Sequence, residues 1–299
     1  MNHNGIDRFY DVETASTEED VQLEHANVDK YNNPRSWRLV TNDEDEEVNV
    51  RIVGVLCHKD LPPFRAQTEH LKLSEKSRLR QHVKLTGLGL PEFEQGWDIV
   101  MQIQNKFDSV MRERSTGRDE LETLEGMRWD GNLVVDLHNR YFTYRSRAGA
   151  EKDIPFTPDV DPIHVLEDAK GADLVHLTDN SVHYLRKKTG EKGEVKYVKF
   201  PPQNFKSGDI VEATYSFVAF PQTGQGKVIK YRLRMVLRAL TLMSSVLREE
   251  ADEKRATEKQ KRAYQMQPKA QLKRKKLCYD TDDDGDDDAR RLKKMCIDS

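Results

Sequence analysis

The sequence predicts an α+β protein with one globular region over residues 36–247 and a charged tail on each side. Apolar residues recur at spacings of three and four within residues 92–111, which is the pattern of an amphipathic helix. Five short segments separated by turn residues follow within residues 173–242, as in a small barrel or a strongly curled sheet. Charged residues make up 34% of the chain against 36% hydrophobic residues, so we expect a modest core and disordered ends.

Strand and helix patterns alternate in the first half of the globular region. Residues 36–41 and 48–57 are expected to be two strands joined by an acidic turn, because the second segment alternates and then becomes apolar. A charged surface helix is expected within 68–83. The clearest helix begins at Pro91, since proline is favoured in a first helical turn. Its apolar stripe consists of Phe93, Trp97, Val100, Ile103, Phe107 and Val110.

The second half is expected to be mostly β. Residues 131–146 predict a hairpin that turns at His138, and residues 161–171 predict a short helix ended by a glycine. A helix beginning near Ala239 is the alternative for the end of the last strand. Residues 172–243 are together expected to form a small antiparallel β-barrel. The candidate strands are 173–177, 181–187, 193–199, 209–220 and 228–242.

Both ends of the chain are expected to be disordered. Residues 1–35 have eight acidic residues against three basic ones and few large aliphatic side chains, and residues 248–299 are strongly charged without the apolar stripe that a coiled coil needs. No run of about 20 apolar residues is present, so no membrane contact is expected. The N-terminus lacks the apolar run of a secretory signal. The three cysteines are odd in number and far apart, which favours a reducing compartment over a disulfide framework or a zinc site.

Two basic clusters lie in the C-terminal segment with ten residues between them. This spacing resembles a bipartite nuclear import signal, in which an extended chain places lysines and arginines in two acidic grooves of a carrier. We therefore expect a nuclear protein with an import carrier as a partner. A solubilising tail and an arm that touches phosphates are the alternatives. The clusters consist of Lys261, Arg262, Lys273, Arg274, Lys275 and Lys276.

An acidic run over residues 280–288 follows the basic clusters. Its spacing partly matches a calcium loop, but Arg291 occupies the place of the glutamate that closes such a loop. Two other interpretations are open. The run is either a polyacidic spacer or a tail that competes with nucleic acid for a basic surface or recruits partners.

A basic stripe is predicted on the segment 228–242, because its side chains alternate between cationic and apolar. Same-face residues on a strand are about 7 Å apart, close to the rise of an extended nucleic-acid backbone. Tyr215 and Phe217 on the neighbouring strand are candidates for stacking on bases. The alternative is an ordinary solvated face of a sheet. The predicted phosphate-contacting residues are Lys230, Arg232, Arg234 and Arg238.

Two resemblances involve residues 176–243. The segment resembles uncharacterised proteins of mushroom-forming fungi, which implies no activity. It is also similar to single-stranded-DNA-binding proteins of the OB-fold type found in phages. The shared pattern is Gly208-Asp209 before a long strand, a glycine-containing turn, a second long strand and an acidic C-terminal tail. This second resemblance implies an OB-like barrel, although here a basic segment separates the barrel from the acidic run.

Enzymatic motifs are missing from the sequence. It has no phosphate-binding loop, dinucleotide fingerprint or nucleophile elbow. Asp136 and His138 share one strand face and could bind a metal with His164, His176 or His183, but such a pair is more commonly a structural hydrogen bond. We expect no enzyme activity, no metal and no cofactor.

The function expected from the sequence is that of a non-enzymatic nuclear protein. It binds single-stranded DNA or RNA through the basic β-face. The alternative is a nuclear protein-interaction scaffold without nucleic-acid contact.

Overall fold

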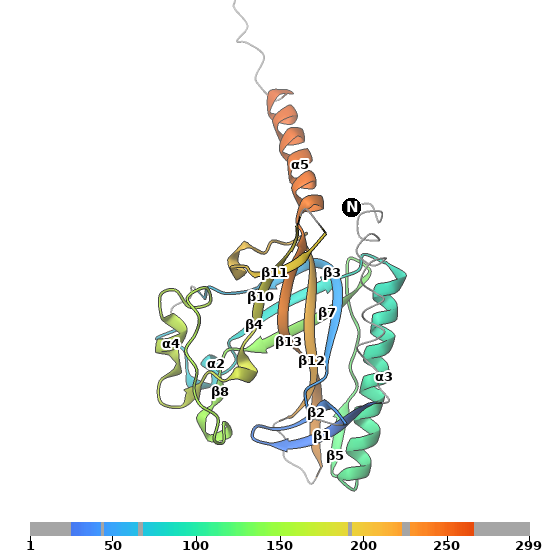
Figure 1. Cartoon of the computed structure of the whole chain (residues 1–299), viewed down its shortest axis with the longest axis vertical. Helices are drawn as coiled ribbons and strands as arrows, with labels where there is room; N and C mark the ends of the chain where they lie inside the picture. The colour runs from blue at the N-terminus through green and yellow to red at the C-terminus, as the bar shows by residue number, and fades with distance from the viewer. Residues whose placement is uncertain (1–24, 43–44, 65–67, 191–192, 223–227, 266–299) are drawn as a thin grey trace, which may run out of the picture. The chain divides into compact units, whose positions relative to one another are not determined.

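The computed structural model describes residues 25–42, 45–64, 68–190, 193–222 and 228–265. These residues form a mixed α+β structure that is mostly sheet, with four α-helices (Figure 1), so the predicted α+β class is confirmed. The chain divides into two compact units, of which the first ends at Glu253 and the second begins at Lys254. Among the described helices, none combines the length and apolar character that crossing a membrane requires.

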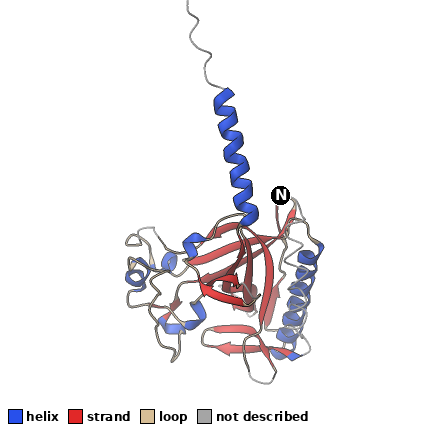
Figure 2. Cartoon of the chain, turned by 45° about the horizontal axis from the view of Figure 1, so that its top comes forward, coloured by secondary structure: helices blue, strands red, loops and turns tan. Residues whose placement is uncertain are grey.

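Eleven strands form one sheet that curls on itself (Figure 2). The order is β1-β2-β12-β3-β4-β7-β13-β10-β11, with β5 beside β13 and β6 beside β7. Because β12 also pairs with β13, the strands β3, β4, β7, β13 and β12 pair in a cycle. In the described chain, β7 and β13 are joined only at His138 and Val236, so the sheet is not a closed barrel. The strands are β1 (Ala26–Asn32), β2 (Arg35–Thr41), β3 (Asn49–Asp60), β4 (Arg80–Thr86), β5 (Asp119–Glu122), β6 (Met127–Trp129), β7 (Asn132–Arg140), β10 (His183–Thr189), β11 (Val195–Lys199), β12 (Ile210–Pro221) and β13 (Ile229–Ser244), with β8 (Thr143–Tyr144) and β9 (Leu174–Val175) in a separate pair.

The curled sheet extends well beyond the predicted barrel over residues 172–243. Three strands of the cycle, β3, β4 and β7, precede that segment in the chain. The sheet also contains parallel pairs, because β13 runs parallel to β5, β7 and β10. The prediction of a small antiparallel barrel at the C-terminal end is therefore wrong in its extent and in its strand directions. The long hairpin of β12 and β13 meets the earlier strands instead of closing locally.

Two local predictions fail at strands β4 and β7. Residues 80–86 form a strand, and only α2 (Leu73–Lys76) is helical within the expected helix over 68–83. Strand β7 continues through His138, where a hairpin turn was expected, because residues on both sides of it pair with β4. At the end of β13, the chain stays extended through Ala239, so the alternative helix there is also wrong.

The helix α3 (Pro91–Arg114) buries its predicted apolar stripe against the sheet. Phe93, Val100 and Phe107 are almost fully buried on it. A Cβ atom at Gly87 would lie 2.3 Å from the Cβ of Phe93, so only glycine permits this approach between α3 and the end of β4. The remaining α-helices are α4 (Val165–Lys170) and α5 (Val246–Gln265).

Ordered structure also extends into both predicted tails. Strand β1 pairs with β2 and buries Val28 opposite Leu39, so residues 26–35 form a strand, a turn and the start of β2 and are not disordered. Residues 246–265 form α5, although 248–299 was expected to be disordered. The rest of both predicted tails lies outside the described residues.

Asp119 joins three parts of this fold. Its side chain is almost fully buried on β5, where Oδ2 accepts a hydrogen bond from the indole Nε1 of Trp37 at 3.1 Å. The same oxygen lies 2.7 Å from the Nζ of Lys30 on β1. The backbone N–H of Asp119 donates to the Ser115 hydroxyl at the end of α3. Asp119 therefore fixes β1, β2 and α3 to the same point.

We expect Asp119→Ala to lower the free energy of unfolding by about 2–3 kcal/mol. The substitution removes the carboxylate that accepts hydrogen bonds from the Lys30 ammonium and from the buried indole N–H of Trp37. Asp108→Ala is the matched control, since Asp108 pairs with Arg112 on the exposed surface of α3 and its loss should cost less than about 0.5 kcal/mol. Urea unfolding of both variants measures the difference. Equal effects would show that Asp119 does not hold these elements together.

Candidate nucleic-acid interface

Strand β13 separates cationic and apolar side chains as its alternation predicts. Its apolar residues from Tyr231 to Leu237 are buried. On the other face, Lys230 and Arg232 are exposed, and Arg234 and Arg238 are half-buried. The predicted stripe therefore exists, but its four cations lie in different surroundings.

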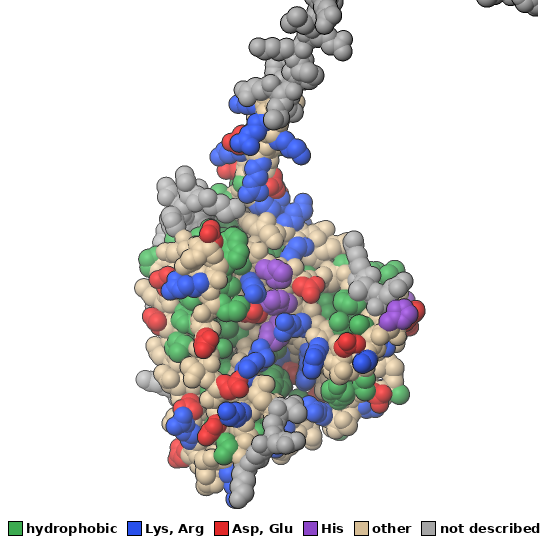
Figure 3. Space-filling view, turned by 180° about the vertical axis from the view of Figure 1, so that it is seen from behind, with side chains coloured by type: hydrophobic (Ala, Val, Ile, Leu, Met, Phe, Trp, Pro, Cys, Tyr) green, Lys and Arg blue, Asp and Glu red, His purple; other side chains and the backbone are tan. Residues whose placement is uncertain are grey.

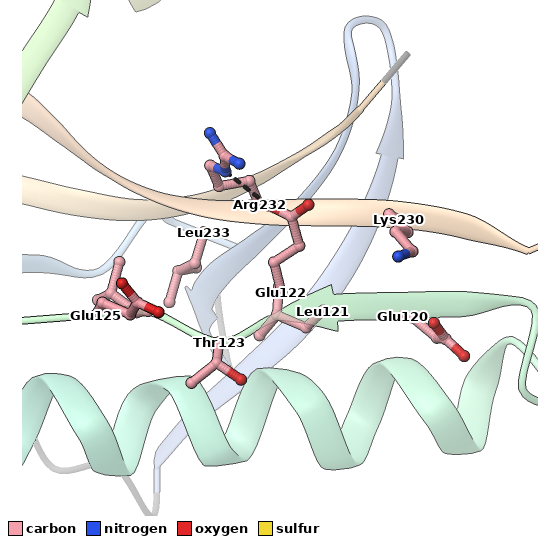
Figure 4. A pocket seen from close by; sticks show the side chains of 9 residues that line it. Glu120, Leu121, Glu122, Thr123, Glu125, Lys230, Arg232 and Leu233 are labelled. Carbon is pink, nitrogen blue, oxygen red and sulfur yellow. Dashed lines mark hydrogen bonds and ion pairs between the residues drawn. The ribbon is translucent and has the colours of Figure 1, made fainter. Parts of the chain in front are cut away.

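Lys230 and Arg232 lie beside an acidic strand (Figure 4). The Nε of Arg232 donates to Glu122 Oε2 at 2.7 Å, and Lys230 lies opposite Glu120 in the parallel register of β13 and β5. Together with Glu125, these residues line a groove of about 610 Å³. Three glutamates thus line this end of the stripe, and one of them is ion-paired with Arg232.

Arg238 is held in a half-buried ion-pair network. Its Nη2 lies 2.7 Å from Glu47 Oε1 and 2.8 Å from Asp179 Oδ1, and its Nε donates to the Ser216 hydroxyl. Arg38 binds Asp179 through two nitrogens, both at 3.0 Å. Burial raises the pKa of Asp179, but the hydrogen bond from Arg38 and the charge of Arg238 outweigh burial and hold it well below its usual range. Arg238 therefore acts first as a structural residue.

Tyr215 and Phe217 belong to the core. Their side chains are 1% and 0% exposed, and their ring centroids lie 5.4 Å apart in an edge arrangement. Alternation places them on the inner face of β12, while Ser216 between them contacts Arg238 on the outer face. The prediction that they stack on bases is wrong, because neither ring is accessible.

A second set of basic side chains lies on β4 and β7, beside Arg234. In the antiparallel register Arg80 is opposite Arg140, and His82 is opposite His138. The ring centroids of His82 and His138 are 6.3 Å apart, and the exposed His58 on β3 lies 5.3 Å from His82. Figure 3 shows histidines in a row on one face, bordered by lysine and arginine. We call the following residues the basic face: Arg80, His82, Lys84, His138, Arg140 and Arg234.

Asp136 is the carboxylate within the basic face. Its Oδ1 lies 2.8 Å from His82 Nε2, and its Oδ2 lies 3.8 Å from Lys84 Nζ. Burial raises the pKa of Asp136, but the imidazoles of His138 and His82 more than offset burial and lower it far below its usual range. Asp136 therefore stays ionised and holds His82 through a hydrogen bond, while the Nδ1 of His138 lies 3.7 Å from its Oδ1.

The arginines of the basic face lower the pKa values of the basic groups next to them. Burial lowers the pKa of His138, and the charges of Arg234 and Arg80 lower it further, against the opposing effect of Asp136. Burial also lowers the pKa of Arg234, with a further contribution from Arg232 and Arg80. Within the described ranges, neither Arg80 nor Arg234 has an ion-pair partner. The basic face therefore includes arginines that no described carboxylate pairs with.

The remaining candidate residues do not converge on a site. Asp136 and His138 share a face as predicted, but His176 stacks on Phe156 at 4.0 Å and has its Nδ1 2.8 Å from the Tyr141 carbonyl oxygen. The described part of the chain contains no group of three or more His, Cys, Asp or Glu side chains placed to hold a metal ion. Of the predicted import signal, Lys261 and Arg262 are exposed on α5. Lys273, Arg274, Lys275, Lys276 and the acidic run 280–288 lie outside the described residues.

No protein-family model and no curated protein matches this chain. Among solved structures, it is similar to the crystal structure of gp2.5, a single-stranded DNA binding protein encoded by bacteriophage T7. The TM-score is 0.35 and the sequence identity is 10%, with 66% of this chain and 91% of that chain covered. A likeness this low does not transfer a function. The predicted similarity to proteins of mushroom-forming fungi stays a prediction.

Asp136→Asn should destabilise the protein in a pH-dependent way. The pKa of Asp136 is lower in the folded chain than the ordinary value of about 3.9, so its ionised form stabilises the fold above about pH 4 and this stabilisation is lost as the pH falls further. We expect a loss of about 1–3 kcal/mol at pH 7 that shrinks below about pH 4. Urea unfolding between pH 3 and 7 measures it. Asp98→Asn, at an exposed site on α3, is the control, and an identical pH profile for both variants would contradict the assignment.

Proposed function

We propose that this protein binds single-stranded nucleic acid across the basic face without catalysing a reaction. The observation that carries the proposal is the position of Arg80 and Arg234, which lie on one sheet face with no ion-pair partner in the described residues. Phosphate contacts made by lysine and arginine supply most of the affinity in sequence-independent binding. The net charge of −3 does not oppose this, because binding depends on the local patch and not on the sum over the chain.

The strand order supports the location of the site. The cycle β3-β4-β7-β13-β12, in which β7 contacts β13 in parallel, has the order of an OB-type sheet. Such sheets are five-stranded and partly open, and the face of their second and third strands binds oligonucleotides. Here those strands are β4 and β7, which carry five of the six residues of the basic face. The chemistry and the topology therefore indicate the same surface.

His58, which adjoins the basic face at His82, takes the stacking role that Tyr215 and Phe217 cannot fill. His58 is exposed, and the rings of His58, His82 and His138 follow one another across three neighbouring strands. Imidazole rings stack on unpaired bases, while the arginines beside them reach phosphates. This arrangement favours single strands, because a duplex keeps its bases away from such rings.

Replacing Arg80 and Arg234 together by glutamine should weaken binding to an oligothymidylate and to oligonucleotides of other sequences by a similar factor, because phosphate contacts carry no base identity. The plot of log affinity against log salt should become shallower by about 1.4, from about 0.7 per lost contact. Fluorescence anisotropy of the full chain measures both effects. The matched control is Lys230→Gln with Arg232→Gln, which removes the same charge from the end of β13 that three glutamates line.

The control variant should bind within about twofold of the parent chain, because rim charges matched by carboxylates contribute little. If both double variants lose affinity equally, non-specific charge and not the basic face explains the binding. If the full chain has no measurable affinity at about 50 mM salt, where charge contacts are strongest, the protein-interaction scaffold is the better function.

Nuclear localisation is a separate part of the proposal and rests on the two basic clusters in the sequence. Replacing Lys273, Arg274, Lys275 and Lys276 by alanine should move a fluorescent fusion from the nucleus to the cytoplasm, because a carrier would lose one of its two contacts. A triple replacement of Lys188, Lys196 and Lys199, on β10 and β11, is the control for lost charge. An unchanged nuclear signal in the first variant would contradict the import signal.

A further inference from the structure

An arginine cluster adjoins the basic face at Arg140. Its guanidinium groups come from four separate elements, namely β2, β7, β13 and the 3-10 helix η3 (Arg145–Arg147). Asn139, next to Arg140, and Arg238 both donate to the Asp179 carbonyl oxygen, at 2.9 and 2.6 Å. Burial lowers the pKa of Arg140, Asp179 opposes this shift, and the charges of three other arginines add to it. We call the following residues the arginine cluster: Arg38, Arg140, Arg147 and Arg238.

The arginine cluster holds more positive charge than its carboxylates balance. Arg38 and Arg238 share both Asp179 and Glu47, at distances between 2.7 and 3.1 Å. These two cations and two anions neutralise each other. Arg140 and Arg147 are additional, and neither forms an ion pair with a described residue. Two positive charges are consequently left over at this place.

Arg140 lacks a polar partner in the part of the chain that the structure describes. Its guanidinium lies over the ring of Phe220, 5.3 Å from the centroid, and its Nη2 is buried without a hydrogen-bond partner. Native proteins satisfy the great majority of buried polar groups, so an unsatisfied guanidinium requires an explanation. Arg147 lies over the ring of Tyr144, 5.4 Å from its centroid. Stacking of this kind leaves the N–H groups in the plane of each guanidinium free for an acceptor.

We propose that the arginine cluster is a binding site for one phosphate group, which Arg140 and Arg147 contact. Inorganic phosphate carries up to two negative charges, which matches the two charges left over, and a backbone phosphodiester carries one. The oxygens of either group accept paired hydrogen bonds from a planar guanidinium. Arg140 also belongs to the basic face and lies opposite Arg80 on β4, so the site continues the surface of the proposed function. If the phosphate belongs to a nucleic-acid backbone, the inference rests on that function. A free phosphate has the same chemistry.

The site is tested first with inorganic phosphate on the full chain. Phosphate should raise the Tm above that in chloride of equal ionic strength, because a ligand that binds only the folded state stabilises it. Arg140→Met should abolish most of this rise without lowering the Tm in chloride, since it removes a buried charge that has no ion-pair partner. Arg112→Met, at an exposed arginine on α3, should keep the full rise.

A merely structural role for Arg140 predicts the opposite pattern, in which Arg140→Met lowers the Tm in chloride and keeps the phosphate effect. That pattern, or the absence of any phosphate effect in the parent chain, would overturn the proposal. Arg147 is exposed, so Arg147→Met provides a second variant whose folding is not at risk. It should weaken phosphate binding about tenfold, as expected for the loss of one charged hydrogen bond, and unchanged affinity would also overturn the proposal.

Binding to an oligothymidylate identifies the source of the phosphate. If a backbone phosphate occupies the site, Arg147→Met should weaken oligonucleotide binding about tenfold, and inorganic phosphate should compete with the oligonucleotide. If a free phosphate occupies the site, Arg147→Met should leave the oligonucleotide affinity unchanged and remove the effect of phosphate on the Tm. Both results support the site.

The two proposals fail in different ways. If the chain binds no oligonucleotide but shows the phosphate effect, the proposed function fails and the phosphate site stands. If Arg80 and Arg234 are needed for the oligonucleotide while neither Arg140 nor Arg147 changes any measurement, the phosphate site fails and the proposed function stands.

Discussion

Strand β13 pairs with four other strands, and these pairings determine the surroundings of its cationic side chains. It runs antiparallel to β12 along most of its length and parallel to β5, β7 and β10 along shorter stretches. Alternation fixes which of its side chains face outward, but the neighbouring strand decides what each of them meets. Arg232 meets the carboxylates of β5, Arg234 lies near His138 of β7, and Arg238 meets Asp179.

This arrangement divides one row of cations into segments with different chemistry. An arginine that already binds a carboxylate must lose that partner, or share it, before it can bind a phosphate. An arginine without a partner carries no such cost, and where it is buried it destabilises the free protein instead. Available positive charge therefore depends on which acidic residues the fold brings near, and a count of basic residues along a strand does not reveal it. The basic face and the arginine cluster are the places where that supply of carboxylates falls short.

Patterns that act within one element could be predicted from the sequence. The apolar stripe of α3 and the alternation of β13 depend on periods of 3.6 and 2 residues, and both are present in the structure. Alternation also shows that Tyr215 and Phe217 share a face, but it cannot tell which face is the core. Strand β4 had the same kind of pattern, with Val83 and Leu85 facing the core between charged residues, yet its charge density favoured a surface helix.

Contacts between distant segments could not be predicted in this way. Asp179 lies 141 residues from Arg38 in the chain, and only the fold brings it to both Arg38 and Arg238. The opposition of Arg80 and Arg140 likewise requires the register of β4 and β7, and like charges directly opposite each other are unfavourable in a sheet. Such local conflicts are expected at functional sites, where stability of the free protein is exchanged for binding. A bound phosphate relieves the repulsion around Arg140 and supplies its missing hydrogen-bond acceptor. The same charge repulsion that destabilises the free protein therefore contributes to the affinity for phosphate.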